Sequence, residues 1–245
     1  NKALLSHPND AELYRQKAIA HSYLAFSFSN DQVLFCDSFH LQLSLKAYSK
    51  AIELDSENGF YYMQKGDFLL RDLERYNEAL ECFKIANELK PDEPSPFLRM
   101  IYSYFALNEL NKIPQLCEEL ISLDFNDPEP FFHLSNYYYL TNDFRKSATY
   151  MSIAIFKLSE GDYVINSQLG KQTYLFDLHL LRSKIYNKLD INILECYDLN
   201  DALKIISKYK NLTEKELWSL EIYVSEEYIN KKNNEIEKLI FGNCK

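Results

Sequence analysis

The sequence predicts an all-α protein, a solenoid of stacked antiparallel helix pairs that ends in a capping helix. A short pattern of small and aromatic residues returns about every 34 residues along the chain. Within each repeat, these residues fall at the spacings of one helix face. Glycine is scarce, at 5 of 245 residues, which favours helices joined by short turns.

The repeat is clearest in the stretch YNEALECFKIANELKPDEP, residues 76–94. Ala79, Phe83, Ala86 and Pro91 follow one another there at intervals of four, three and five residues. Stepping along the chain by 34 or 35 residues finds three further copies of the pattern. The positions that match Ala79, Phe83 and Ala86 are Ser44, Tyr48 and Ala51, then Ile113, Cys117 and Leu120, then Ser147, Met151 and Ala154.

A second helix precedes each of these helices. The segments FYYMQKGDFLL, PFLRMIYSYFAL and PFFHLSNYYYL, at 60–70, 96–107 and 130–140, share one layout. An aromatic near the start is followed three or four residues later by an interface position such as Gly66. Proline-containing turns, PSPF at 94–97 and PEPF at 128–131, separate the repeats. The unit is therefore helix A, tight turn, helix B, proline-marked turn.

This unit resembles the tetratricopeptide repeat (TPR). Ala79, Phe83, Ala86 and Pro91 match the family's helix-B pattern, and Gly66 matches its glycine-like position in helix A. Tyr62, Phe97 and Phe131 stand in place of its consensus tryptophan. The resemblance covers roughly residues 10–210 and implies about five repeats, which form a right-handed superhelix with A helices along its concave side. We expect a TPR domain at 1–211 and a C-terminal capping helix at 212–245.

The end repeats are less regular. Repeat 1 pairs AELYRQKAIAHSYLAF with FHLQLSLKAYSKAIEL, with about 14 extra residues between the usual positions, including SNDQVLFCDS. Repeat 5 pairs YLFDLHLLRSKIYNKL with LNDALKIISKYK, which leaves DINILECYD as an insertion. A second parse uses Leu169 and Gly170 as the helix-A pair, with EGDYVINSQ as linker or helix. The last element opens with a capping box, Thr213 and Glu216, and is interpreted as a solvating cap or, alternatively, a partner-binding helix.

Charge and composition exclude several kinds of partner. The 27 basic and 36 acidic residues give a net charge of −9, which disfavours nucleic acid and anionic membranes. No apolar run approaches the roughly 18 residues of a membrane span. The opening NKALLSHPND is not a signal peptide, although a targeting segment could precede it. We expect a cytoplasmic protein.

The number and spacing of the cysteines also favour a cytoplasmic protein. There are five, Cys36, Cys82, Cys117, Cys196 and Cys244. The count is odd and no pair has C-x-x-C spacing, so neither a disulfide framework nor a zinc site is expected. Most cysteines should be small buried hydrophobic residues, as a reducing compartment allows.

The family register assigns the positions that face the groove, and these are the candidate binding residues. They are rich in aromatic residues and methionine, and exposed apolar surface usually marks a binding site. We expect an apolar or aromatic segment of a partner, with Arg99, His133 and Asn136 as polar anchors; the alternative is that the aromatic residues belong to the core. The candidates are Arg15, Tyr23, Met63, Leu98, Arg99, Tyr102, Phe105, Phe132, His133, Asn136 and Tyr139.

A carboxylate clamp of the chaperone-associated type is not expected. In that subclass, lysine, arginine and asparagine bind a C-terminal carboxylate. The matching positions here are Arg15, Ile19, Gln64, Ser95 and Arg99, of which only two are basic.

The sequence contains none of the catalytic motifs that we searched for. The histidines are scattered, with no H-x-x-x-H or H-E-x-x-H spacing, and neither a nucleophile elbow nor a phosphate-binding loop occurs. We therefore expect no enzyme activity, metal or cofactor. The resemblance implies an interaction scaffold or adaptor that binds a peptide or helix of a partner protein, with a TPR-type chaperone or peptide-sensing regulator as the alternative. The oligomeric state is expected to be a monomer or a weak dimer, because a solenoid can also self-associate.

Overall fold

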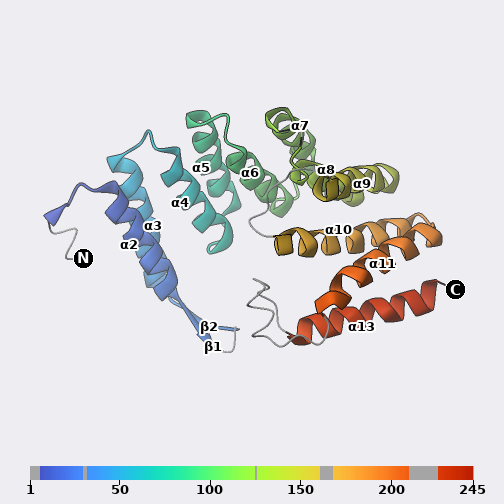
Figure 1. Cartoon of the computed structure of the whole chain (residues 1–245). Helices are drawn as coiled ribbons and strands as arrows, with labels where there is room; N and C mark the ends of the chain where they lie inside the picture. The colour runs from blue at the N-terminus through green and yellow to red at the C-terminus, as the bar shows by residue number, and fades with distance from the viewer. Residues whose placement is uncertain (1–5, 30–31, 125, 161–167, 210–225, 245) are drawn as a thin grey trace. The chain divides into compact units, whose positions relative to one another are not determined.

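The computed structural model describes residues 6–29, 32–124, 126–160, 168–209 and 226–244. Across these residues the chain is helical apart from one β-hairpin (Figure 1). The predicted all-α class is therefore confirmed. The chain divides into two compact units, residues 1–112 and 113–245. The predicted domain boundary at 211/212 lies outside the described residues.

The first unit consists of helix pairs in sequence order. α2 (Ala11–Ala25) packs on α3 (Ser38–Leu54), and α4 (Gly59–Arg71) packs on α5 (Tyr76–Leu89). α6 (Pro94–Ala106) packs on α5 and is followed by the 3-10 turn η1 (Leu110–Lys112). Asparagine and aspartate begin two of these helices, because Asn58 and Asp37 accept hydrogen bonds from the backbone N–H groups of Phe60 and Phe39.

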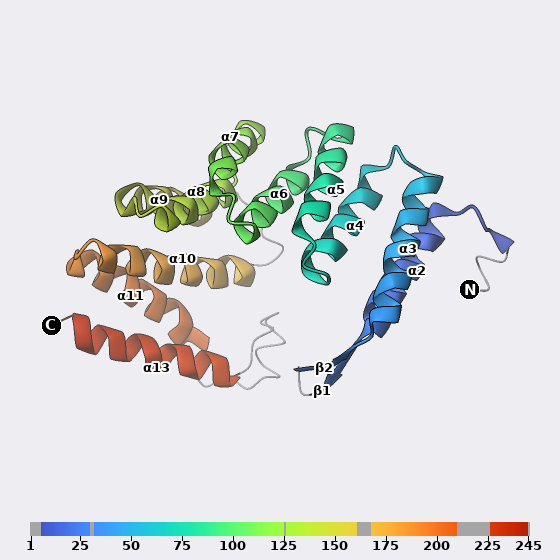
Figure 2. The same ribbon diagram turned by 180° about the vertical axis from the view of Figure 1, so that it is seen from behind.

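The second unit continues the same alternation. It contains α7 (Ile113–Leu123), α8 (Glu129–Leu140), α9 (Phe144–Glu160), α10 (Gln168–Lys188), α11 (Asn192–Ile206), η2 (Ser207–Tyr209) and α13 (Glu226–Asn243). α8 packs on α9 and α9 on α10, while α10 packs on α11 and α11 on α13 (Figure 2). α13 therefore covers the last helix pair, as expected of a capping helix.

The repeat positions read from the sequence form the core. All twelve, from Ser44 to Ala154, are buried, and none is more than 4% exposed. In α4, a Cβ atom added to Gly66 would lie 2.9 Å from the Cδ1 and Cζ atoms of the Phe83 ring on α5. Only glycine leaves room for that ring. In α8 and α9, two serines meet instead, because the Ser135 hydroxyl donates to the Ser147 carbonyl at 2.8 Å and Ser147 returns the bond at 2.9 Å.

The turns between A and B helices share one conformation. Glu74, Asn108, Asn142 and Asp190 each have a positive φ, between 53° and 63°. The residue after each donates its N–H to a carbonyl near the end of the A helix, at 2.9–3.0 Å, in Arg75→Leu69, Glu109→Tyr104, Asp143→Tyr138 and Ile191→Tyr186. The last three bonds join residues five positions apart, as in the Schellman turn, whereas the bond from Arg75 to Leu69 spans one residue more. The first three of these residues are 34 apart, which gives the repeat its length.

The fourth of these turns corrects the prediction for repeat 5. DINILECYD is not an insertion, since helix α11 begins at Asn192 immediately after the turn at Asp190. The extra length lies before the turn. The segment 161–167, the alternative parse around EGDYVINSQ and the capping box at Thr213 and Glu216 fall wholly or partly outside the described residues.

The extra residues of repeat 1 form the β-hairpin. Strand β1 (Phe26–Ser29) pairs antiparallel with β2 (Gln32–Cys36), with Phe26 opposite Cys36 and Ser29 opposite Gln32. The hairpin continues directly from the end of α2 (Figure 1). The sequence carried a signal for it, because FSFS alternates with period two and QVLFC is rich in strand-forming residues.

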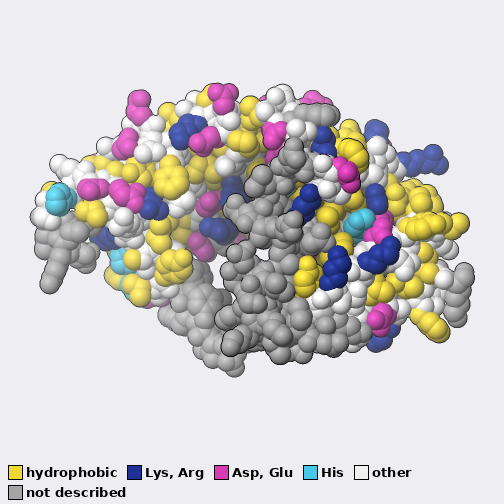
Figure 3. All heavy atoms as spheres, viewed as in Figure 1, with side chains coloured by type: hydrophobic (Ala, Val, Ile, Leu, Met, Phe, Trp, Pro, Cys, Tyr) yellow, Lys and Arg dark blue, Asp and Glu magenta, His cyan; other side chains and the backbone are white. Residues whose placement is uncertain are grey.

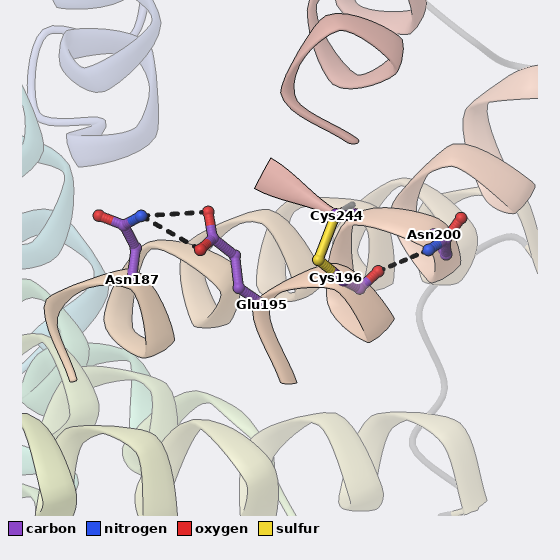
Figure 4. The surroundings of a disulfide bond; sticks show 5 residues. All are labelled: Asn187, Glu195, Cys196, Asn200 and Cys244. Carbon is purple, nitrogen blue, oxygen red and sulfur yellow. Dashed lines mark hydrogen bonds between the residues drawn. A yellow bond between two sulfur atoms is a disulfide. The ribbon is translucent and has the colours of Figure 1, made fainter. Parts of the chain in front are cut away.

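A disulfide overturns the expectation that the cysteines are unpaired. Cys196 on α11 is bonded to Cys244, directly after α13, with their Cα atoms 5.7 Å apart (Figure 4). The bond ties the capping helix to the last repeat, while Cys82 and Cys117 are free and buried as predicted. Because disulfides persist mainly in oxidising compartments, the cysteines no longer support a cytoplasmic location. No helix in the described ranges is long and apolar enough to cross a membrane.

The close approach of the Phe83 ring to Gly66 predicts the effect of a substitution at this glycine. Gly66→Ala should lower the free energy of unfolding by about 1–3 kcal/mol, because the fully buried Phe83 ring has no space to move into. Denaturant unfolding measures this. Gly242→Ala in α13 is the matched control, since a Cβ there meets nothing within 4 Å and alanine is the better helix former. Equal stability of Gly66→Ala and the parent chain would contradict the packing described.

The disulfide makes a second prediction. Reduction should destabilise the folded chain by about 2–4 kcal/mol, because the bond closes a loop between residues 48 apart. Thermal unfolding with and without a phosphine reductant measures the loss. The double variant Cys196→Ser, Cys244→Ser should show no response to reductant. Alkylation of four or more cysteines in the unreduced, unfolded chain would show that the bond is absent.

Candidate functional site

The A helices of the first unit, α2, α4 and α6, carry the candidate binding residues of repeats 1 to 3. α6 reaches α4 through Arg99, whose Nε lies 2.7 Å from Asp67 Oδ1. This contact is an ion pair without hydrogen-bond geometry. Arg15 on α2 is held by Glu12 in a two-point contact at 2.7 and 2.6 Å, and its guanidinium lies 5.4 Å from the centre of the Phe60 ring on α4. Charged contacts therefore fix the positions of both predicted arginines.

Each of these A helices leaves one aromatic side chain in solvent. Tyr23 on α2 is 76% exposed, Phe60 on α4 is 46% exposed and Tyr102 on α6 is 41% exposed. Met63, Leu98 and Phe105, the other predicted apolar contacts in this unit, are half-buried. Over α4 to α6, the surface in Figure 3 shows acidic and basic side chains beside hydrophobic ones. This mixture suits a partner that brings both apolar and polar groups.

A cavity of about 360 Å³ opens between α2, α3 and α4. Its lining is mixed, with aromatic rings, an aliphatic side chain, carboxylates, an amide, a hydroxyl and a guanidinium. The residues are Ile19, Ser22, Tyr23, Tyr48, Gln64, Asp67, Phe68, Arg71 and Asp72. Of the predicted site residues, the cavity includes only Tyr23.

Burial shifts two titrating groups of the cavity. It raises the pKa of Tyr48 to about 12, so the phenol stays protonated and remains able to donate a hydrogen bond. Burial also raises the pKa of Asp72; the charge of Arg71 opposes that rise and the charge of Asp67 adds to it. The cavity is thus a site where a carboxylate has lost part of its hydration.

The candidates of repeat 4 lie in the second unit, on α8, and most are engaged in packing. Phe132 packs against the core of α8, α9 and α10, and its ring lies edge-on to Tyr174 at 6.1 Å. Tyr139 packs on the same core and edge-on to Phe144 at 5.5 Å. Asn136 is half-buried. For Phe132 and Tyr139, the structure supports the core interpretation that the sequence left open.

His133 does not offer the polar anchor that was expected. Its side chain is 1% exposed, so a partner on the surface has no access to the imidazole. The family register gives the direction of a side chain around its helix. It does not give the depth, which depends on neighbours from other repeats.

The cavity also contains residues that the sequence did not indicate as binding residues. The cavity is lined in part by Ser22, Tyr48, Gln64, Arg71 and Asp72, none of which is among the binding candidates predicted from the sequence. Asp72 ends α4 as its C-cap, a position outside the helix face on which the register was applied. Recognising that helix ends contribute to grooves would have identified it.

In the described residues, no group of three or more histidine, cysteine, aspartate or glutamate side chains is placed to hold a metal ion. The absence of enzyme activity stays a prediction from the sequence.

Burial of His133 has a measurable consequence. Burial lowers its pKa to about 4, whereas the unfolded chain protonates histidine near 6.5. The unfolded state therefore takes up the proton first, and stability should fall as the pH drops from 6.5 towards 4, by about 3 kcal/mol at the lower limit. His133→Gln should remove this part of the pH dependence, measured by urea unfolding at several pH values. A pH profile unchanged by the substitution would show that His133 is accessible to protons in the folded state.

Comparison with solved structures identifies the fold. No protein-family model and no curated protein matches the sequence. Among solved structures, MamA (residues 41 to the end) from Desulfovibrio magneticus RS-1 superposes with a TM-score of 0.61 at 12% identity, covering 82% of this chain and 97% of that one. PilF from Pseudomonas aeruginosa gives 0.58 at 17% identity, with coverage of 90% and 86%.

YrrB, described as a TPR protein with an unusual peptide-binding site, gives a TM-score of 0.55 at 19% identity and covers 83% of this chain and 90% of its own. These likenesses extend over most of the chain, and all three neighbours are built from stacked TPR helix pairs. At these identities they establish the fold. The repeat positions, the turns and the structural neighbours agree that the chain has the fold of the tetratricopeptide repeat proteins.

Proposed function

We propose that this chain is a protein-interaction scaffold that binds a segment of a partner protein along the A-helix face of its first unit. The observation that carries the proposal is that every A helix of the first unit keeps one large aromatic side chain exposed. The repeat positions of the B helices are buried, whereas α2, α4 and α6 each hold a large aromatic side chain in solvent, at Tyr23, Phe60 and Tyr102. Aromatic side chains kept in solvent are the usual anchors of protein interfaces.

The polar groups of this face support the same proposal. The Arg15 and Arg99 side chains are fixed by Glu12 and Asp67, so little side-chain entropy would be lost when a partner docks beside them. Their charges are already matched, which weighs against capture of a bare C-terminal carboxylate. The TPR fold of YrrB, whose description includes a peptide-binding site, is compatible with a segment bound in extended or helical form.

The binding surface predicted from repeat 4 is not part of this proposal. Phe132, Tyr139 and His133 pack within the second unit, so truncating them would damage the fold before it tested binding. Partner recognition is assigned to Tyr23, Met63, Leu98, Tyr102 and Phe105, with Phe60 added from the structure.

A displayed random-peptide library selected on the full chain supplies a defined probe. The dissociation constant of a selected peptide is then measured by calorimetry. Tyr23→Ala with Tyr102→Ala should weaken binding at least tenfold, because each truncation removes an anchor worth about 1 kcal/mol or more.

The matched control is Phe39→Ala. Phe39 is an aromatic of similar exposure on the B helix α3, and its loss should leave the dissociation constant unchanged. Peptides that bind the double variant as tightly as the parent chain, or that are lost with Phe39→Ala, would refute the A-helix face as the binding surface.

A further inference from the structure

The cavity between α2, α3 and α4 has an excess of negative charge. Two carboxylates, Asp67 and Asp72, and one guanidinium, Arg71, line it. Asp67 is already paired with Arg99, which lies outside the lining. Among the residues that the structure describes, no side chain donates a hydrogen bond to the Asp72 carboxylate. Burial raises the pKa of Asp72 and the charge of Arg71 acts to lower it, but neither a hydrogen bond nor an ion pair joins the two described side chains. Asp72 is therefore the carboxylate of the cavity to which a further cation can bond.

The backbone adds to this negative field. Asp72 caps the C-terminus of α4, its N–H donating to the Phe68 carbonyl at 3.0 Å. Ser22 and Tyr23, which also line the cavity, belong to the last turn of α2, which ends at Ala25. Helix C-termini carry a partial negative charge that favours cations. Two such ends bound the same cavity.

Burial makes a cation more valuable here than on an open surface. Asp72 is half-buried, and part of its hydration has been lost without a replacement bond. The same burial raises the pKa of Asp72. A positive group brought to the carboxylate would restore the lost stabilisation, in a medium where charges are screened less than in water.

The walls suit a long aliphatic stem that carries the charge. The Tyr48 and Phe68 rings pack with their centres 5.6 Å apart, and Ile19 adds an aliphatic surface. The exposed ring of Tyr23 adds an aromatic face over which a cation can lie. The volume of about 360 Å³ is at the small end of ligand pockets, which run from about 300 to 1,000 Å³. It matches one side chain rather than a long segment.

We infer that this cavity receives an arginine or lysine side chain of the partner segment, with the cation beside Asp72 and the stem against Ile19 and Tyr23. The inference rests on the proposed function and specifies the partner's chemistry at one position. An acidic side chain would meet two carboxylates and two helix C-termini against the single guanidinium of Arg71, and is disfavoured by these charges.

Small probes test the cavity directly. The full chain, labelled with nitrogen-15, is titrated with N-acetyl-argininamide, N-acetyl-lysinamide and N-acetyl-citrullinamide, the last being the neutral analogue of the arginine probe. At least one cationic probe should give saturable shifts centred on the amides of Ser22, Tyr23 and Asp72, with citrullinamide binding at least fivefold more weakly. Equal binding of argininamide and citrullinamide, or no saturable shift at these amides with either cation, would overturn the inference.

A charge-neutral variant makes the test specific. Asp72→Asn should weaken the cationic probe at least fivefold, whereas Asp92→Asn, which removes one carboxylate from an exposed turn of the same unit, should not. Because burial disfavours the charged form of Asp72, the Asp72→Asn chain should be at least as stable as the parent near neutral pH, which thermal unfolding verifies. The citrullinamide comparison uses the unaltered chain and does not depend on any variant.

The selected peptides separate this inference from the proposed function. Replacing a single arginine in such a peptide by citrulline should weaken its binding at least fivefold. If the Tyr23 and Tyr102 truncations abolish binding while citrulline is tolerated at every position, the A-helix face stands and only the cation site falls. If the truncations have no effect, the proposed function falls with it.

Discussion

Close contact between the two helices of each pair is the constraint on which the remaining structure depends. It is met by different chemistry in different repeats. Gly66 leaves room for the Phe83 ring, Ser135 and Ser147 exchange hydroxyl-to-carbonyl bonds, and the Ser44 hydroxyl donates to the Ala18 carbonyl at 2.9 Å. In each case a small residue lets one backbone approach the other. The glycine of the family pattern is thus one solution among several, which explains how this chain keeps the fold with 5 glycines.

The same constraint decides which face is left for a partner. The B-helix positions are used to bury each pair and the next helix, so each of their side chains is fixed by the part of the core that it fills. On the A helices of the first unit, Tyr23, Phe60 and Tyr102 stay exposed. The turns reinforce this division, because a left-handed residue at the same repeat position, such as Asn108 or Asn142, sets the same entry for each B helix. Binding residues can then change without disturbing the stack.

The sequence predicts the elements that depend on local spacing and fails where distant residues meet. The 34-residue period identifies the helix pairs and every buried repeat position, because both follow from which residues share a helix face. The hairpin of repeat 1 was missed although its alternation is visible, since the helical repeat was extended across it. The start of α11 was missed because a turn marked by Asp190 lacks glycine and proline. The bond between Cys196 and Cys244, and the burial of His133, depend on residues from other elements, which no spacing within one helix shows.

The end of the chain shows what a stack needs when no further repeat follows. The last pair is covered by α13 through a small apolar cluster, with Leu199 and Ile236 among its members. Ionic and covalent ties supplement that cluster. Arg182 donates to both oxygens of the buried Asp198 carboxylate, at 2.9 and 2.7 Å, and to the Ser152 hydroxyl on α9 at 3.0 Å. His179 Nδ1 lies 2.9 Å from the same carboxylate. A buried charge held by several partners is costly to separate, so this network and the disulfide together tie four helices, α9, α10, α11 and α13, where apolar burial alone is limited. Rigid ends of this kind keep a solenoid from fraying.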